Sequence, residues 1–321
     1  MLSTQIEDFK GEDPRDEALS AARYRAGRTS TLVSIVVNIA LVMLQVTAGV
    51  FSGSQALIAD GIHSLSDLIS DFVVLLAGHH SRKQADDDHQ YGHQRYETAA
   101  SLALGALLLA VGLGMLVSAA QKIQHYGETP PVHVAALWVA LAALLAKELL
   151  FRYMLRIAER VRSSMLVANA WHARSDAASS LVVALGIVGS LAGFTLLDPV
   201  AAAVVGLMVV RTGWGFFWSA LHDLMDRAVS AEEGEAIRAT LLATPGVQGV
   251  HDLRTRRMGD LTLVDVHLEI DGTLTVTEGH AIAIDARSRV LAAHPVLDVM
   301  THVDPVDAVD VVDAVEQGDA Y

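Results

Sequence analysis

The stretch ADGIHSLSD, at residues 59–67, sets His63 and Asp67 four residues apart within an apolar segment. A second stretch repeats this spacing: ANAWHARSD at residues 168–176, with His172 and Asp176. Residues at i and i+4 share one face of a helix, so each segment presents an imidazole and a carboxylate together. Two such faces brought together supply four nitrogen and oxygen ligands, the number and type that a tetrahedral zinc-like ion takes.

These polar pairs lie in segments that we expect to sit in lipid. Ionisable side chains there cost about 2.5–3.5 kcal/mol each on insertion scales and mark an ion pathway by default. The alternative is that they only hydrogen-bond between packed helices, and the repeated motif favours the ion site. Three neighbouring polar residues are candidates for extra ligands, ligand-orienting groups or the lining of an ion entrance, with a supporting role favoured: Asp60, Asp71 and Asn169.

Composition also indicates a membrane protein. The 321 residues are 52% hydrophobic, mean hydropathy is +0.38, and the apolar residues occur in long blocks. The absence of cysteine from the sequence excludes disulfides and thiolate metal ligands. A formal net charge of −14 argues against binding to nucleic acid. The acidic, polar start of the chain predicts no cleaved signal peptide.

The apolar blocks predict six membrane helices, since a span needs about 20 largely apolar residues. The expected spans are residues 31–52, 55–78, 98–122, 131–154, 165–190 and 195–221. Lysine and arginine concentrate before the first span, between the second and third, and between the fourth and fifth. By the positive-inside rule both termini are expected in the cytoplasm. His63 then lies nine residues below Ser54 and His172 eight above Ser164, so both reach about 12–14 Å into the bilayer, near its midplane.

The chain changes character after about residue 228. A helix capped by Ser230 is expected first, then two strands, a second helix and a last strand. Alternation in LTLVDVHLEI puts Asp265, His267 and Glu269 on one face of a strand, together with Leu263. The prediction is thus a membrane all-α six-helix bundle followed by a small cytoplasmic α+β (α-β-β-α-β) domain. Its expected parts are an N-terminal segment (1–28), the transmembrane domain (29–227), the α+β domain (228–306) and an acidic, disordered tail (307–321).

Two further clusters are candidate metal sites. In the loop between the second and third spans, Asp86, His89 and His93 are spaced to close on one ion, although loop histidines are often merely solvated. The α+β domain carries five potential ligands, whose convergence spacing alone does not show: His251, His267, His280, His302 and Asp304. Two ion pairs are also expected, Lys147 with Glu148 near Arg152, and Arg95 with Asp226.

Five stretches of the sequence together resemble those of a known family. SGSQALIADGIHSLSDLISD, DDDHQYGHQRYE, ANAWHARSDA, VHDLRTRRMG and HVDP together resemble the cation diffusion facilitator family, over about residues 30–305. The resemblance implies a homodimer with six transmembrane helices per protomer and a metallochaperone-like cytoplasmic domain. It also implies export of divalent metal from the cytosol in exchange for protons.

By the same resemblance, the residues divide into three sites. His63, Asp67, His172 and Asp176 look like the transport site, and Asp86, His89 and His93 look like the loop site. The potential ligands of the α+β domain look like a binuclear cytoplasmic site, with His280 between its ions. The other ligands of that site are His251, His267, His302 and Asp304. The branch closest in its cytosolic histidines, associated with zinc and iron, usually has Asp at the position of His63. The histidine resembles the zinc-preferring branch, whose His-rich loop between the fourth and fifth helices is missing here.

The expected function is therefore proton-coupled export of divalent metal, most readily Zn²⁺, with Fe²⁺, Co²⁺ or Cd²⁺ as alternatives. The expected setting is the bacterial cytoplasmic (inner) membrane, with metal ions, protons, lipid and a second copy of the chain as partners. A membrane-anchored metal sensor or store is a competing hypothesis. No enzyme activity is expected, because the sequence has no HExxH-type motif and four protein ligands leave no open position for water.

Overall fold

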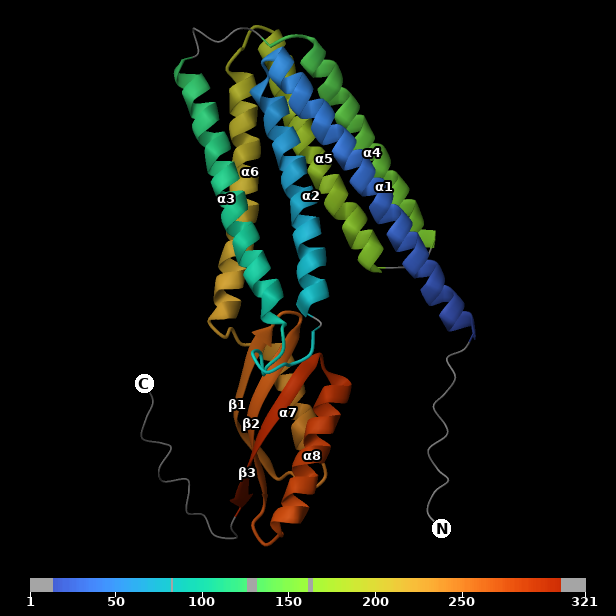
Figure 1. Ribbon diagram of the computed structural model, residues 1–321, viewed down its shortest axis with the longest axis vertical. Helices are drawn as coiled ribbons and strands as arrows, with labels where there is room; N and C mark the ends of the chain where they lie inside the picture. The colour runs from blue at the N-terminus through green and yellow to red at the C-terminus, as the bar shows by residue number, and fades with distance from the viewer. Residues whose placement is uncertain (1–13, 82, 126–131, 161–163, 307–321) are drawn as a thin grey trace. The chain divides into compact units, whose positions relative to one another are not determined.

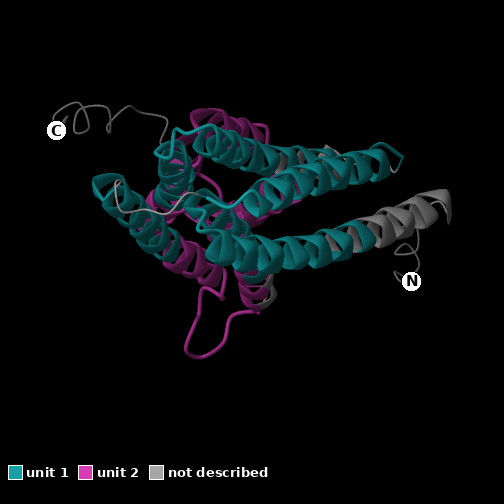
Figure 2. Ribbon diagram, turned by 90° about the horizontal axis from the view of Figure 1, so that it is seen from above, with its two compact units in different colours: residues 1–72, 106–214 teal, residues 73–105, 215–321 magenta. Residues whose placement is uncertain are grey.

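The computed structural model describes residues 14–81, 83–125, 132–160 and 164–306. Within them, six long helices precede a small α+β domain (Figure 1). The helices are α1 (Pro14–Ser52), α2 (Gln55–Ser81), α3 (Arg95–Gln124), α4 (Ala135–Arg160), α5 (Ser164–Leu191) and α6 (Leu197–Leu224). The chain divides into two compact units, residues 1–72 with 106–214 and residues 73–105 with 215–321 (Figure 2).

Four helical segments of the described residues are long and apolar enough to cross a bilayer. They are Leu32–Ser52, Arg95–Gln124, Ala173–Leu191 and Leu197–Leu224. The helices outside this set, α2 and α4, carry charged residues in mid-helix, Asp60 and Asp67 on α2, Lys147 and Glu148 on α4. The predicted helical transmembrane region is confirmed, whereas the number of six spans stays a prediction.

A glycine lets α1 and α2 approach closely beside the His63 motif. A Cβ atom added at Gly61 would lie 2.7 Å from Cγ2 of Val46 on α1 and 3.2 Å from the backbone nitrogen of the same residue. Small residues let membrane helices pack with their backbones near one another. The face of α2 that carries Gly61 is therefore packed closely against α1, two residues before His63.

The domain after α6 contains α7 (Ala231–Leu242), β1 (Gly249–Met258), β2 (Leu261–Asp271), α8 (Val276–Ala293) and β3 (Val296–Val306), which confirms the predicted order. Ser230 caps α7 in a capping box with Glu233, as the sequence predicts. The sheet order is β1-β2-β3, with β1 antiparallel and β3 parallel to β2.

Both helices of this domain cover one face of the sheet (Figure 1). The core between them contains Val264, Val266 and Leu268 of β2, Leu241 of α7 and Val290 of α8. Because side chains alternate along a strand, the intervening residues of β2 face away from the helices. The polar residues of β2 therefore gather on the face of the sheet opposite the helices.

Candidate metal sites

The first candidate site joins α2 and α5 within the transmembrane region. Ligand atoms of His63, Asp67 and Asp176 all lie within 4.8 Å of one another. Nδ1 of His63 is 3.6 Å from Oδ2 of Asp67, and the His63 side chain is buried. The fourth predicted ligand, His172, lies one turn before Asp176 on α5, and its side chain is outside the described residues. An imidazole and two carboxylates from two helices thus lie close together.

Asp60 lies one turn before His63 and is fully engaged by other groups. Its carboxylate accepts hydrogen bonds from Gln45, Ser179 and Ser180. Lys147 completes the shell with its ammonium nitrogen 3.3 Å from Oδ1. The side chains of Asp71 and Asn169, the other two candidates for support, lie outside the described residues.

The predicted pairing of Lys147 with Glu148 is wrong. Lys147 pairs with Asp60 on α2, and Glu148 pairs with Arg152 on its own helix, at 2.7 Å. Adjacent helical residues point about 100° apart and do not face one another, whereas residues at i and i+4 do.

The second candidate site is in the loop between α2 and α3. Ligand atoms of Asp86, His89 and His93 lie within 4.8 Å of one another. The two oxygens of Asp86 are each 3.4 Å from a ring nitrogen, Nδ1 of His89 and Nε2 of His93. Nδ1 of His93 is 3.1 Å from the carbonyl oxygen of Gln84, which it can approach only as a donor. In the neutral ring, Nε2 of His93 is then the nitrogen without a hydrogen. It faces Asp86, so its lone pair is available to a metal ion.

The ionised form of Asp86 is stabilised by its neighbours. The backbone N–H of His89 donates to its carboxylate at 2.8 Å and holds the pKa of Asp86 below its ordinary value, with a smaller effect from the nearby His93. This interaction is present above the ordinary pKa of an aspartate and is lost only as pH falls through the lowered folded-state pKa.

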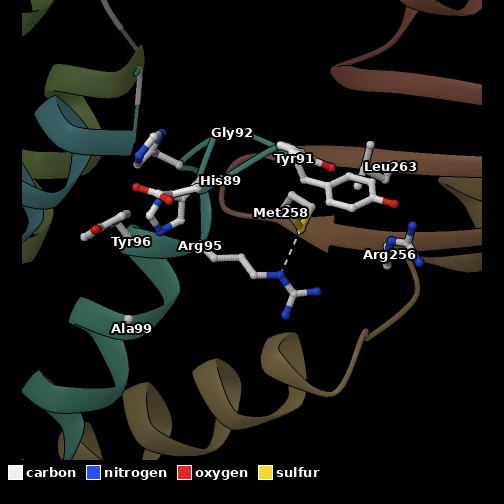
Figure 3. A pocket seen from close by; sticks show the side chains of 12 residues that line it. His89, Tyr91, Gly92, Arg95, Tyr96, Ala99, Arg256, Met258 and Leu263 are labelled. Carbon is white, nitrogen blue, oxygen red and sulfur yellow. Dashed lines mark hydrogen bonds between the residues drawn. The ribbon is translucent and has the colours of Figure 1, made fainter. Parts of the chain in front are cut away.

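A cavity of about 580 Å³ lies beside the loop site (Figure 3). Its lining combines residues of the loop, α3 and the sheet, including His89, Tyr91, Arg95, Tyr96, Arg256 and Met258. Tyr96 also stacks on His93, with ring centroids 5.6 Å apart. The loop histidines therefore border a space large enough for a hydrated ion.

Arg95 joins the start of α3 to the end of α6. Its Nη2 is 2.6 Å from Oδ1 of Asp226, so the predicted ion pair is present. Its Nε also donates to the sulfur of Met258 on β1, at 3.2 Å (Figure 3). One guanidinium thus connects the loop, the end of α6 and the sheet.

We expect Arg95→Glu to lower the metal transport predicted from the sequence several-fold, because it places two carboxylates together where the pair was. Arg95→Glu combined with Asp226→Arg should recover most of the lost rate, since the exposed pair is restored with its charges exchanged. Uptake by membrane vesicles, normalised to the amount of protein, measures both variants. A double variant no better than Arg95→Glu would show that the pairing itself is unimportant.

The third candidate site is a row of histidines across the open face of the sheet. The strand register sets His251 of β1 opposite His267 of β2, and His267 opposite His302 of β3. The ring centroids are 5.0 Å apart in the first pair and 4.7 Å in the second. Three imidazoles therefore line up on adjacent strands.

Asp304 joins this row by contacting all three rings. Oδ2 of Asp304 is 2.8 Å from Nδ1 of His267 and 3.1 Å from Nε2 of His251, and Oδ1 is 3.1 Å from Nε2 of His302. The potential ligands fall into two overlapping groups, His251 with Asp252 and His267, and His267 with His302 and Asp304, and imidazole with carboxylate is a donor combination that fits zinc-type ions. Among the described residues, His280 joins no such cluster, because it lies on α8, which covers the other face of the sheet.

Two carboxylates beside this row were not among the predicted ligands. Oε1 of Glu269 is 3.7 Å from Nε2 of His251, and Asp252 groups with His251 and His267. The alternation of β2 already placed Glu269 on the face of His267, so a signal for it existed. Asp252 lies at a register shift in β1 and has a positive φ of 48°, which no local pattern indicates.

Comparison with known proteins gives consistent matches over most of the chain. A family model described as the cation efflux transmembrane domain matches residues 31–225, and one for the cytoplasmic domain of cation efflux proteins matches residues 229–306. Metal tolerance protein C1 of Arabidopsis thaliana is 35% identical over 288 residues, which are 85% of this chain. This chain spans only 61% of the length of that relative.

Two further similar proteins are a bacterial relative and a solved domain. The manganese efflux system protein MneS of Bacillus subtilis is 32% identical over 283 residues, covering 88% of this chain and 97% of MneS. The metal-bound C-terminal domain of the CzcD transporter from Thermotoga maritima is 29% identical, covers 25% of this chain and 93% of that domain, and has a TM-score of 0.23.

Proposed function

The chain belongs to the cation diffusion facilitator family of divalent-metal efflux transporters, and we propose that it exports Zn²⁺ from the cytosol in exchange for protons. One observation carries this proposal: His63, Asp67 and Asp176 converge from two transmembrane helices. His172 is proposed as the fourth ligand, because its position on α5 relative to Asp176 repeats that of His63 relative to Asp67.

The donor set supports zinc as the preferred ion. Two imidazoles with two carboxylates make a borderline-to-hard site, and four such ligands suit the tetrahedral geometry of Zn²⁺. Fe²⁺, Co²⁺ and Cd²⁺ are the alternative substrates, and the similarity to the manganese efflux system protein MneS makes Mn²⁺ a further ion to compare. Binding of all five ions to the wild type and to His63→Asp ranks them.

Proton exchange follows from the chemistry of the ligands. An imidazole must be neutral to bind metal, so loading of the site from the cytosol releases any proton that the ring holds. When the helices rearrange and the site opens to the other side, protonation of the same rings displaces the ion. A proton gradient can therefore drive export by alternating access.

The loop and domain clusters are proposed as resident metal sites. The loop site comprises Asp86, His89 and His93, and the domain site comprises His251, His267, His302 and Asp304, with His280 as a further candidate. Ions bound there would hold adjacent segments together by shared coordination. We propose that the α+β domain mediates homodimerisation, in keeping with its match to the cytoplasmic domain of cation efflux proteins. Six membrane spans in the cytoplasmic (inner) membrane of a bacterium, with both termini in the cytoplasm, complete the proposal.

The proposed exchange predicts uptake into inside-out vesicles under a pH gradient. Acidifying the lumen should drive Zn²⁺ inward, because luminal protons displace the ion after each transit. Addition of nigericin, which collapses the pH gradient in potassium buffer, should lower uptake to the level of the same vesicles without an imposed pH gradient. Uptake that does not depend on the pH gradient would contradict proton coupling. Vesicles that bind Zn²⁺ without any flux would favour the alternative function of a membrane-anchored metal sensor or store.

A further inference from the structure

A buried ion pair lies within the bundle and has no part in the exchange described above. The Nζ atom of Lys147 on α4 is 3.3 Å from Oδ1 of Asp60 on α2. Asp60 is 0% exposed and Lys147 only 3% exposed. A charge buried in this way is strongly destabilising without its partner. The two opposite charges stabilise each other, and the pair therefore links α2 to α4.

The carboxylate of Asp60 is surrounded by four donor groups, at least three of which donate to it at any one time. Besides Lys147, Oδ1 lies 2.8 Å from the hydroxyl of Ser179. Oδ2 accepts from Nε2 of Gln45 at 2.5 Å and from the hydroxyl of Ser180 at 2.6 Å. A carboxylate offers about four lone-pair sites, and here four donors face them. Asp60 is thus kept apart from the ligand set, although it lies only one turn from His63 on the same helix.

The same network reaches the backbone of a proposed ligand. The carbonyl oxygen of Asp176 lies 3.5 Å from Nζ of Lys147 and 2.7 Å from the hydroxyl of Ser179. The single hydrogen of Ser179 can serve either Asp60 or this carbonyl oxygen. Lys147 therefore contacts both the excluded carboxylate and the turn of α5 that carries Asp176.

We infer that Lys147 is a positioning and specificity-determining residue of the transport site. It holds Asp60 out of the coordination shell of the ion and fixes the turn that carries Asp176. The inference rests on the proposed function of His63, Asp67 and Asp176. Without Lys147, the carboxylate of Asp60 becomes a further oxygen ligand beside His63. Oxygen-rich sites suit Mn²⁺, whereas imidazole suits Zn²⁺, so the ammonium group keeps the site selective for zinc over manganese.

Proteoliposomes containing the full chain test this role through initial rates of Zn²⁺ and Mn²⁺ uptake. Lys147→Met should lower Zn²⁺ uptake about tenfold and raise the ratio of Mn²⁺ to Zn²⁺ rates at least about threefold. Asp60→Asn with Lys147→Met should return both quantities to within about threefold of wild type, because no unpaired charge remains. A loss of folding alone would not change the ratio of the two rates.

Asp60→Asn alone supplies a second test, which holds even if Lys147→Met fails to reach the membrane. It leaves the ammonium of Lys147 unpaired near the ligands, so the KM for Zn²⁺ should rise about tenfold through repulsion. Adding Lys147→Met to Asp60→Asn should reverse that rise.

Glu148→Gln with Arg152→Met is the matched control. It removes an ion pair that starts one residue further along α4, with Arg152 60% exposed, and should leave rates near wild type. Unchanged ion ratio and KM in both single variants, or a double variant no better than the worse single one, would overturn the inference. Absence of transport by the wild-type chain would instead count against the proposed function.

Discussion

Asp176→Ala is expected to reduce Zn²⁺ uptake about a hundredfold or more, because it removes one of the convergent ligands on the proposed path. The remaining ligands would be His63 and Asp67 of α2 and the proposed ligand His172, so α5 would keep only one of its two ligands. With one ligand left on α5, movement of that helix would close and reopen the site poorly. The rate of uptake by inside-out vesicles under a pH gradient measures the loss.

Glu148→Ala is the matched control for this experiment. It also removes a carboxylate from a helix of the bundle, but one that pairs with the exposed Arg152 and belongs to no ligand cluster among the described residues. Its uptake should stay within about twofold of wild type, as most substitutions of exposed ion pairs do little. Uptake by Asp176→Ala equal to that of the control would exclude Asp176 from the transport site.

Asp304→Ala is expected to abolish most metal-dependent stabilisation of the α+β domain. Its carboxylate contacts all three imidazoles of the row, so its loss removes a ligand and the orientation of the others. A fall in affinity of about a hundredfold would remove about 2.7 kcal/mol of stabilisation by Zn²⁺. Hydrogen exchange of the β1–β3 amides in the full chain, with Zn²⁺ and with chelator, measures this as about a hundredfold loss of protection.

Asp265→Ala provides the comparison on the same strand face. Asp265 pairs with Arg256 at 3.5 Å and lies outside the histidine row. We expect Zn²⁺ to protect the strands of this variant as it protects the wild type. Equal protection in Asp304→Ala would mean that the row binds no metal through Asp304.

The sequence predicts local spacing well and long-range register poorly. The pairs at i and i+4 on α2 and α5 follow directly from helical geometry, and so does the cap at Ser230. The alignment of His251, His267 and His302 does not. It depends on a register shift in β1 and on the parallel placement of β3, which the folded sheet determines. Spacing along the chain therefore left the convergence of these ligands open.

The partner of Lys147 shows the same limit in the bundle. Sequence proximity suggested Glu148, whereas the buried position of Lys147 brings it to Asp60, on another helix.

Hydropathy marks where a helix can cross a bilayer but not where it ends. Thus α1 begins at Pro14, well before the predicted span at residue 31. The polar residues before the apolar block continue the helix, and their one proline, Pro14, stands at its first position, where proline is tolerated.

We propose that ligands from α2 and α5 together bind one ion. X-ray absorption at the zinc edge tests it on the full chain after the loop and domain histidines have been replaced. We predict one Zn²⁺ per chain, with two imidazole nitrogens and two carboxylate oxygens at about 2.0–2.2 Å, and loss of that ion in Asp176→Ala. A chain that binds no zinc under these conditions, or that retains the same coordination without Asp176, would contradict the claim.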